Sequence, residues 1–190
     1  MRLQSSKQTT VEKSNRPWAF SEIRYNAAPS IIVPAVSSGR RKYIPTGFVK
    51  GNTVIYHSAF AIYNGDTYTF GIINSYIHVL WAKTVGGKLK NDYRYSAQLC
   101  YNTFPFPTIS EEKKEQIEEA AENVLVTRAF YPEKTLAELY DPDKMPEDLK
   151  EAHAVLDDIV ESCYPGYPFT NDEARLECLF KLYEKMTNKK

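Results

Sequence analysis

The 190-residue chain lacks the short signatures of several enzyme classes. It contains no GxGxxG or GxxxxGK[ST] phosphate-binding motif, no HExxH zinc motif and no GxSxG nucleophile motif. The Asn/Asp/Ser-Pro-Pro-Tyr/Phe motif with which amino-methyltransferases hold a target base is also missing. These absences argue against catalysis by the chain itself, and we expect no catalytic residue in it.

Cysteines, histidines and long apolar runs are scarce as well. Three cysteines without a CxxC pair argue against a disulfide framework and fit a reducing, cytoplasmic location. Three scattered histidines show no metal-ligand spacing, so no metal site is expected. No apolar run approaches the ~20 residues of a membrane span, and we expect no membrane partner. The polar N-terminus lacks a signal-peptide core and is typical of an interior linker, so we expect a piece of a longer protein.

The net charge of zero hides an asymmetry between the two halves of the chain. Residues 1–109 carry 13 Lys and Arg against 4 Asp and Glu, whereas residues 110–190 carry 11 against 20. The difference is +9 for the first section and −9 for the second. Such a division suggests a polyanionic partner for the first section. Attraction between the two sections within one fold is the alternative.

The chain changes character near Pro105–Pro107. Before this point it is aromatic, β-branched and basic, with short apolar runs separated by turn residues, which is typical of strands. Strands are expected within 30–36, 42–49, 53–63 and 67–73, with Asn64-Gly65-Asp66 as a hairpin turn between the last two. One helix is expected in 74–86, capped by Asn74 or Ser75 and ended by Gly86 in a left-handed conformation.

After Pro107 the pattern is helical. Ser110 precedes a glutamate-rich first turn and an apolar stripe, a second helix is expected from Pro146, and a third follows a capping box at Thr170 and Glu173. The sequence therefore predicts an α+β protein. It would have a linker at 1–14, a strand-rich domain with one inserted helix at 15–109, and a small all-α domain at 110–190.

The stretch VGGKLKNDYRYS (85–96) places Lys90, Asp92 and Arg94 at every second position. In an extended segment these side chains share one face, and Tyr93 and Tyr95 point the other way. A lysine donates to guanine O6 and N7 and an aspartate accepts from cytosine N4, so Lys90 and Asp92 could read one G·C pair. Because phosphates repel an aspartate, its presence among cations favours base contact over backbone contact. A solvated Lys–Asp pair explains the spacing equally well.

A second basic cluster lies in VSSGRRKYIP (36–45) and contains Ser37, Ser38, Arg40, Arg41 and Lys42. Small hydroxyls beside consecutive cations suit contacts with phosphates, and one arginine could enter a groove. A solvated basic turn is the competing interpretation.

Two other features have weaker implications. His57 and Ser58 interrupt the apolar run TVIYHSAFAIY (53–63), and they mark either a strand end that faces a ligand or a bulge. Asp66 and Asp92 are the two aspartates inside the strand-rich region, which is too few for the clustered carboxylates of a two-metal nuclease.

Five segments together resemble the C-terminal part of MmeI-like type IIG/IIL restriction–modification enzymes, single chains that combine nuclease, adenine methyltransferase and target recognition. In chain order the segments are VPAVSSGRRKYIPTGF, TVIYHSAFAIY, FGIINSYIHVLWAKTVGGKLKNDYRYS, LCYNTFPFP and LYDPDKMPEDLKEAHAVLDDIVESCY. They cover nearly the whole chain. The resemblance implies a target-recognition domain at 15–109 followed by the family's C-terminal helical domain at 110–190.

The resemblance also implies roles for individual residues. Lys90 and Asp92 occupy two positions that this family uses to read one base pair. His57 falls where the family varies residues that face the DNA, and Arg94 is expected at the phosphates or in a groove. Gly39 occupies a further recognition position, usually a glutamate followed by arginines, so that contact is expected to be lost or replaced.

We therefore expect a module for sequence-specific recognition of duplex DNA, with no cofactor of its own. The expected partners are double-stranded DNA and the methyltransferase domain of the same parent chain, where the resemblance places S-adenosylmethionine. The parent is expected to be an adenine-N6 DNA methyltransferase, with or without endonuclease activity. The alternatives are a protein-interaction module without DNA specificity, and a small nuclease or RNA-processing enzyme that uses Asp66 and Asp92.

Overall fold

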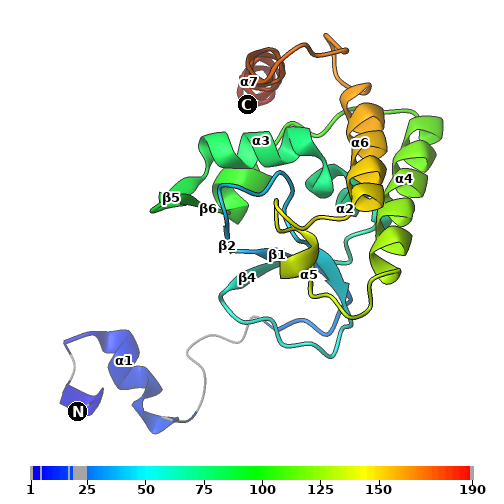
Figure 1. The fold of residues 1–190 in the computed structure, drawn as a ribbon. Coiled ribbons are helices and arrows are strands. Elements are labelled where there is room, and N and C mark those ends of the chain that lie inside the picture. The colour runs from blue at the N-terminus through cyan, green and yellow to red at the C-terminus, as the bar shows by residue number, and fades with distance from the viewer. Residues whose placement is uncertain (1, 5, 17, 19–24, 189–190) are drawn as a thin grey trace.

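The computed structural model describes residues 2–4, 6–16, 18 and 25–188 (Figure 1). The strands are β1 (Ser30–Pro34), β2 (Val36–Ser37), β3 (Gly47–Val49), β4 (Ala59–Tyr63), β5 (Gly87–Leu89) and β6 (Asp92–Arg94). The α-helices are α1 (Gln8–Glu12), α2 (Thr67–Asn74), α3 (Tyr76–Val85), α4 (Glu111–Ala129), α5 (Leu136–Leu139), α6 (Glu147–Glu161) and α7 (Asp172–Thr187). Short 3₁₀ turns lie at Arg2–Gln4 and Lys13–Asn15, and a π-helical turn lies at Ala97–Tyr101. None of the helices described is long and apolar enough to cross a membrane.

Two small antiparallel sheets form the strand-rich section. In the first, β1 lies between β3 and β4, and in the second β6 lies between β2 and β5. Ala35 alone separates β1 from β2, and its N–H donates to the carbonyl oxygen of Ser58 at 2.8 Å. Its own carbonyl accepts from the N–H of Tyr95 at 3.0 Å. The two sheets are therefore joined at Ala35, where β4 and β6 approach from opposite sides.

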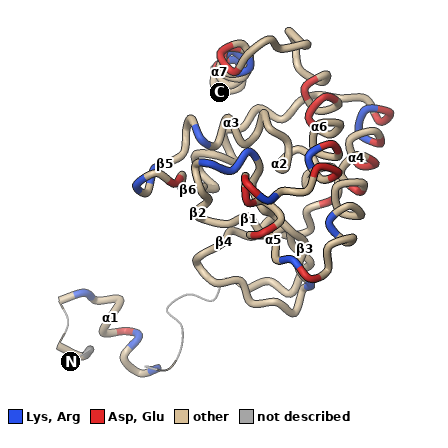
Figure 2. Tube along the Cα trace, in the orientation of Figure 1, with Lys and Arg blue, Asp and Glu red and all other residues tan. Residues whose placement is uncertain are grey.

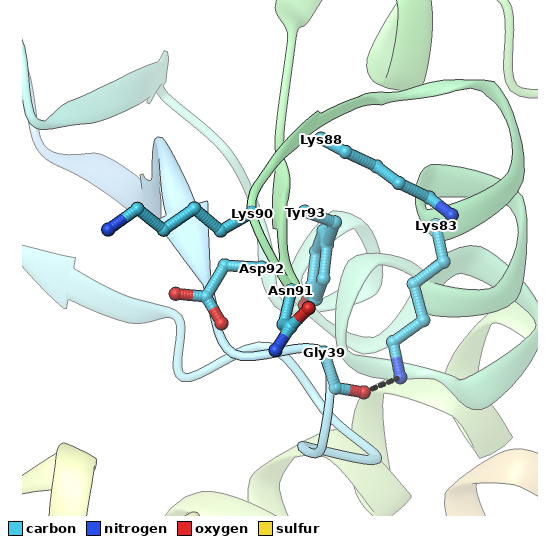
Figure 3. Close-up of a pocket in the computed structure, with 7 residues that line it drawn as sticks. All are labelled: Gly39, Lys83, Lys88, Lys90, Asn91, Asp92 and Tyr93. Atoms are coloured by element: carbon cyan, nitrogen blue, oxygen red, sulfur yellow. Dashed lines mark hydrogen bonds between the residues drawn. The ribbon is translucent and has the colours of Figure 1, made fainter.

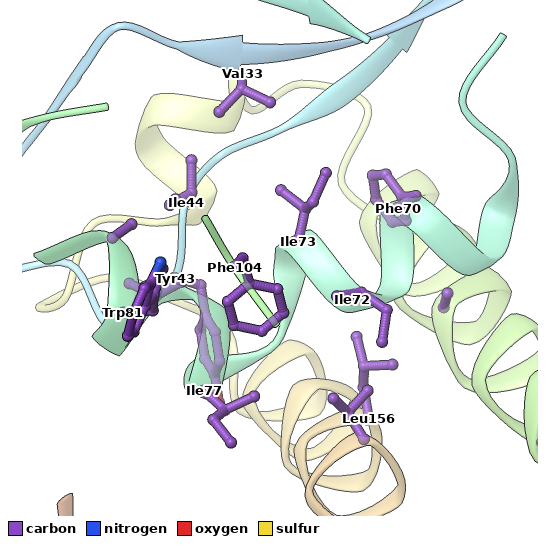
Figure 4. Close-up of a cluster of buried hydrophobic side chains, with 14 of the residues drawn as sticks. Val33, Tyr43, Ile44, Phe70, Ile72, Ile73, Ile77, Trp81, Phe104 and Leu156 are labelled. Atoms are coloured by element: carbon purple, nitrogen blue, oxygen red, sulfur yellow. The ribbon is translucent and has the colours of Figure 1, made fainter. Parts of the chain in front are cut away.

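Helices α2 and α3 lie between the sheets and the C-terminal helices. The α2 helix packs against α4 and α6, and α3 packs against α6 and α7 (Figure 1). Figure 4 shows Ile73 of α2 directed toward Val33 of β1, whereas Ile72 is directed toward Leu156 of α6. All four side chains are fully buried. Apolar side chains on several sides of α2 are therefore buried, some against the first sheet and others against the C-terminal helices, as expected of a central helix.

The hydrophobic core is shared by the two sections of the chain. One cluster of buried side chains includes Ile31 and Ile77 from the first section and Ile117, Leu149 and Leu179 from the second. Burial of this kind is the dominant stabilising contribution in a folded domain, at roughly 25 cal/mol per Å² of apolar surface. The change of composition near residue 107 therefore does not coincide with a gap in the core.

The C-terminal helices agree largely with the expectation from the sequence. Ser110 caps α4, since its Oγ accepts from the N–H of Lys113 at 3.3 Å, and the stripe at Ile117, Ala121 and Val124 is buried. Pro146 directly precedes α6, as predicted. The third helix is also present, but Asn171 caps it in place of Thr170, because the Asn171 side chain accepts from the Ala174 N–H. The short α5, with a capping box at Thr135 and Glu138, was not expected. The α+β class is confirmed.

The expected strand at 67–73 is wrong, because this segment is α2. The Asn64-Gly65-Asp66 turn leads into that helix and not into a hairpin: Asn64 has a φ of 53°, and Asp66 Oδ1 accepts from the N–H of Thr69 at 2.8 Å as an N-cap. Tertiary burial on several sides of the segment outweighs the strand preference of its aromatic and β-branched residues. The strand-rich section thus contains two consecutive helices, α2 and α3, where one was expected.

Three smaller expectations are also corrected. Gly86 ends α3 with a φ of −74°, so the left-handed exit is wrong. Within 42–49 only β3 is extended as a strand, and within 53–63 only β4 is. The rest of the first segment, residues 42–46 around Pro45, is bent or irregular, because proline does not favour a continuous ladder. The rest of the second segment is irregular at 53–56 and forms a turn at His57 and Ser58.

A polar network centred on Arg128 crosses the core. Arg128 lies on α4 and is 8% exposed. Its guanidinium donates to the Thr46 carbonyl oxygen at 2.8 Å, to Asn74 Oδ1 at 3.0 Å and to the Tyr140 hydroxyl. The Tyr140 hydroxyl also shares a 2.7 Å hydrogen bond with Nε2 of His153 on α6. The network thus joins α2 and the residue before β3 in the first section to α4, α6 and the residue after α5 in the second.

Acidification from pH 7.5 to pH 5 is expected to lower the free energy of unfolding. Burial lowers the pKa of His78 to about 3 and the pKa of His153 well below its usual value, whereas both titrate near ~6.5 when unfolded. Between these pKa values the unfolded chain binds more protons, so stability falls as the pH falls. Burial raises the pKa of Asp157 to about 6, so the folded chain binds the extra proton there and offsets part of the loss.

Urea unfolding followed by circular dichroism at several pH values measures this dependence. His153→Gln removes one titrating group and should flatten the slope of stability against pH. Asp157→Asn removes the opposing contribution and should steepen it. Equal unfolding free energies at pH 5 and pH 7.5 in the unsubstituted chain would contradict the expectation.

Candidate nucleic-acid interface

The segment that carries Lys90, Asp92 and Arg94 is a β-hairpin. Strands β5 and β6 pair antiparallel with Leu89 opposite Asp92, and the chain reverses at Lys90 and Asn91. Lys90 has a φ of 56°, as a two-residue hairpin turn requires of a central residue. The expectation that all three charged residues share one extended strand is therefore wrong for Lys90, because the turn interrupts the strand. Asp92 and Arg94 do lie on β6 and on the same face of it.

Buried tyrosines anchor the hairpin to the core. Tyr93 and Tyr95 are each 4% exposed, while Arg94 between them is exposed. The Tyr95 hydroxyl shares a 2.9 Å hydrogen bond with Nε2 of His78 on α3. The Lys83 ammonium lies over the Tyr93 ring, 5.6 Å from its centroid. The prediction that the tyrosines face away from the charged residues is confirmed.

A basic groove lies between the hairpin tip and the loop around Gly39 (Figure 3). Its lining residues are Gly39, Lys83, Lys88, Lys90, Asn91, Asp92 and Tyr93. Figure 3 shows the side chains of Lys90 and Asp92 extending from the tip in the same direction, with Lys83 and Lys88 on the other side of the hairpin. The turn therefore brings a donor and an acceptor side by side, although they belong to different parts of the hairpin.

The C-terminal section binds the two arginines of the 38–42 loop. Arg40 donates to both carboxylate oxygens of Asp143, at 2.8 and 2.7 Å. Arg41 donates from Nε to the Tyr140 carbonyl oxygen at 3.2 Å and from its second terminal nitrogen to that of Ala137 at 3.1 Å. The sequence left open whether the two oppositely charged sections attract each other within one fold, and at this loop they do.

The other polar residues of this loop differ in how far they reach solvent. The Lys42 ammonium lies 3.6 Å from the Asp157 carboxylate, and its side chain stays 56% exposed. Ser38 Oγ accepts from the Arg40 N–H at 3.3 Å within the turn. Ser37 is 3% exposed because its side chain shares the buried face with Tyr93, its partner across β2 and β6. The structure thus places the Ser37 hydroxyl inside the protein, away from the position expected for a phosphate contact.

His57 and Arg94 lie at opposite edges of the β1–β2 segment around Ala35. Arg94 is opposite Val36 on β2. His57 directly precedes Ser58, whose carbonyl accepts from Ala35 on the other side. His57 is exposed, and its ring packs edge-on against Tyr56 with centroids 4.0 Å apart. Two candidate residues from distant parts of the sequence therefore both lie near Ala35, where the two sheets join.

Lys83 is a contributor that sequence reasoning missed. Its ammonium donates to the Arg41 carbonyl oxygen at 2.7 Å and to the Gly39 carbonyl oxygen at 3.3 Å, and so ties the loop to the last turn of α3. Burial lowers the pKa of Lys83. Its place in the last turn of the helix was visible in the sequence, but a basic residue there is commonly explained by the helix dipole.

The described part of the chain offers no metal centre. It contains no group of three or more His, Cys, Asp or Glu that could hold a metal ion. Asp66, one of the two carboxylates considered for a nuclease, is occupied as the N-cap of α2. The arrangement can therefore present donors, acceptors and positive charge to a ligand, which suits recognition.

Comparison with known proteins matches both sections of the chain. Residues 1–108 match the family described as "MmeI, target recognition domain", and residues 109–189 match "MmeI, C-terminal domain". The chain is 45% identical over 188 residues to "DNA methyltransferase A" of Bacillus subtilis (strain 168). The aligned region covers 99% of this chain and 21% of that protein.

A solved structure supports the same relationship. It is the structure of the type IIL restriction–modification enzyme MmeI in complex with DNA. The two proteins superpose with a TM-score of 0.92 at 39% sequence identity, and the matched region covers 98% of this chain and 25% of the MmeI chain. The chain thus spans about a fifth to a quarter of the length of these relatives.

Proposed function

This chain belongs to the family of MmeI target recognition and C-terminal domains, and from that membership we propose that it recognises a specific sequence in duplex DNA. The observation that carries the proposal is the hairpin tip, where Lys90 and Asp92 extend side by side from a ribbon anchored by buried tyrosines. A two-stranded ribbon fits the major groove of B-DNA, where every base pair presents a distinct pattern of donors and acceptors.

Lys90 and Asp92 read one G·C pair in this proposal. The lysine donates to O6 and N7 of the guanine, and the aspartate accepts from N4 of the cytosine. Arg94 and His57, on the surface beside the hairpin, contact the neighbouring groove or backbone. Because the aspartate would be repelled by phosphates, its place at the exposed tip supports contact with a base edge.

The basic residues around the tip supply sequence-independent affinity. Arg40 and Lys42 keep exposed side chains despite their acidic partners, and Lys88 lines the groove at the hairpin. Arg41 already donates to two backbone carbonyls, so we assign it to holding the loop and expect less phosphate contact from it. Neutralising phosphates releases counterions, so affinity falls steeply with salt.

We further propose that the longer protein is an adenine-N6 DNA methyltransferase. S-adenosylmethionine and the catalytic residues belong to the part outside this chain, and the methyltransferase domain is its partner on the other side of the DNA. The name of the Bacillus subtilis relative and the MmeI–DNA complex support this assignment, and the absence of catalytic motifs agrees with recognition as the role of this chain.

Mapping methylated bases in a host that carries the natural gene, beside a host in which it is deleted, tests the proposal. We expect one methyladenine motif that is present with the gene and absent after its deletion. One position of this motif should always be a G·C pair. Binding of the 190-residue chain to duplexes of that motif should fall with rising salt. A chain that binds all duplexes equally and depends weakly on salt would indicate a protein-interaction module and overturn the proposal.

A further inference from the structure

Gly39 makes the closest approach between the 38–42 loop and the hairpin tip. A Cβ atom built on Gly39 would overlap the backbone carbonyl oxygen of Asn91. The two backbones therefore lie in direct contact at one wall of the basic groove (Figure 3). Gly39 has no positive φ, so it is the space, and not the backbone conformation, that requires a glycine here.

The carbonyl that Gly39 touches belongs to the peptide that joins Asn91 to Asp92. Moving this oxygen rotates the peptide and so shifts Asp92 on one side and Asn91 on the other, and Asn91 directly follows Lys90 in the turn. Lys90 already holds a φ of 56°, where a residue with a side chain has few alternative conformations. A small displacement of the tip is therefore passed directly to the donor and the acceptor.

The loop that carries Gly39 cannot move aside easily. Lys83 donates to the carbonyl oxygen of Gly39 itself and to that of Arg41. Arg41 in turn donates to two carbonyl oxygens of the C-terminal section, and Arg40 pairs with Asp143. The hairpin tip, in contrast, projects from strands of three residues each. If the contact becomes too close, the turn residues at the tip yield, because the loop stays in place and β6 is anchored by the buried Tyr93 and Tyr95.

We propose that Gly39 is a positioning residue that sets where Lys90 and Asp92 lie and thereby determines the base pair preferred at one position of the recognition sequence. The inference rests on the proposed function and adds to it a residue that acts through the hairpin backbone. It also implies that positions 39, 90 and 92 act together, so that a change at one alters what the others recognise.

Gly39→Ala tests the proposal, with Gly87→Ala as the matched control. Both substitutions add one methyl group beside the same hairpin, but a Cβ at Gly87 would meet only Cβ of Arg94, at an ordinary 3.8 Å. The full natural protein with each substitution is used for methylation mapping, and duplexes with all four base pairs at each motif position are compared in binding. For Gly39→Ala we expect at least a 5-fold change in preference at the position read by the hairpin tip, within the ~1–3 kcal/mol of one base contact. The other positions and the Gly87→Ala protein should keep their preferences.

Each outcome has a defined meaning. A wild-type protein that shows a motif, with identical profiles for both variants, overturns the role of Gly39 and leaves the proposed function intact. A wild-type protein without any sequence preference overturns the proposed function and with it the premise of this inference. A uniform loss of affinity at all positions in Gly39→Ala indicates a structural effect and also overturns the positioning role.

An NMR measurement on the unsubstituted chain tests the contact even if the Gly39→Ala variant does not fold. In the NMR spectrum of the unsubstituted chain, nuclear Overhauser effects are expected between the Gly39 α-protons and the amide protons of Asn91 or Asp92. If these signals are absent, the close contact does not exist in solution and the proposal is overturned.

Discussion

Replacing Arg128 by methionine is expected to lower the free energy of unfolding by about 3–5 kcal/mol, the cost of breaking a buried charged network by removing one partner. Methionine replaces the aliphatic part of the side chain but is shorter and has no donor. The Thr46 carbonyl, the Asn74 amide oxygen and the Tyr140 hydroxyl would each lose their bond to the guanidinium. A buried acceptor left without a donor costs ~1–3 kcal/mol, so three such losses account for an effect of this size.

Arg40→Met is the matched control, because the Arg40 side chain is 69% exposed and its partner Asp143 is 66% exposed. An exposed ion pair contributes ~0–1 kcal/mol, so this variant should unfold nearly as the unsubstituted chain does. Urea unfolding at neutral pH, followed by circular dichroism, compares the three proteins. Equal losses from Arg128→Met and Arg40→Met would show that the buried network does not stabilise the core as described.

Exchanging the charges at the hairpin tip, with Lys90→Glu and Asp92→Arg together, is expected to change the base pair preferred at one motif position while binding is retained. The double substitution leaves the net charge unchanged, so the general attraction to phosphates should persist. Arginine donates to guanine and glutamate accepts from cytosine, which reverses the order of donor and acceptor along the tip. The original base pair should lose ~1–3 kcal/mol of preference for each lost contact.

Methylation mapping of the double variant in the natural protein measures this change directly. Lys88→Ala serves as the control, because Lys88 is opposite Tyr93 and its side chain lies away from Lys90 and Asp92 (Figure 3). It should weaken binding to all sequences alike and reduce the dependence on salt. If the double variant weakens every base variant equally, Lys90 and Asp92 do not read a base.

Local sequence signals predicted those elements whose stability is itself local. Ser110 with its acidic first turn predicted the start of α4, and the stripe at Ile117, Ala121 and Val124 predicted its buried face. These features depend on residues three or four apart, which lie on the same face of a helix. The class of the fold and the family followed from segments that cover nearly the whole chain.

Elements decided by distant neighbours were predicted less well. The segment 67–73 has the composition of a strand, and only burial between β1 and α6 makes it a helix. The hairpin turn at Lys90 was missed because lysine is an unusual choice for a residue with positive φ. The partners of Arg40 and Arg41 lie about a hundred positions away, and the charge asymmetry alone could not distinguish an internal partner from an external polyanion.

Figure 2 shows acidic residues of the C-terminal section on α4, α6 and α7 and beside α5. Of the basic residues of the first section, Arg40 and Arg41 contact the region of α5. Part of the positive charge of the first section is therefore paired with acidic residues of the second section within the molecule. The hairpin, in contrast, extends away from the acidic helices (Figure 2), and its Lys88, Lys90 and Arg94 are exposed. These three charges are therefore available to an external partner.

The contacts of the 38–42 loop also show which residues a chimeric enzyme would need to keep together. Arg41 binds backbone carbonyls, which any homologous C-terminal section would offer, but Arg40 depends on a carboxylate at 143. Arg128 similarly needs Asn74 and Thr46 from the other side of the junction. A graft that ends near residue 109 would combine a recognition surface with a foreign scaffold and disturb the geometry it was meant to transfer. We therefore expect a chimera to keep the geometry of the recognition surface best when residues 25–188 are exchanged together.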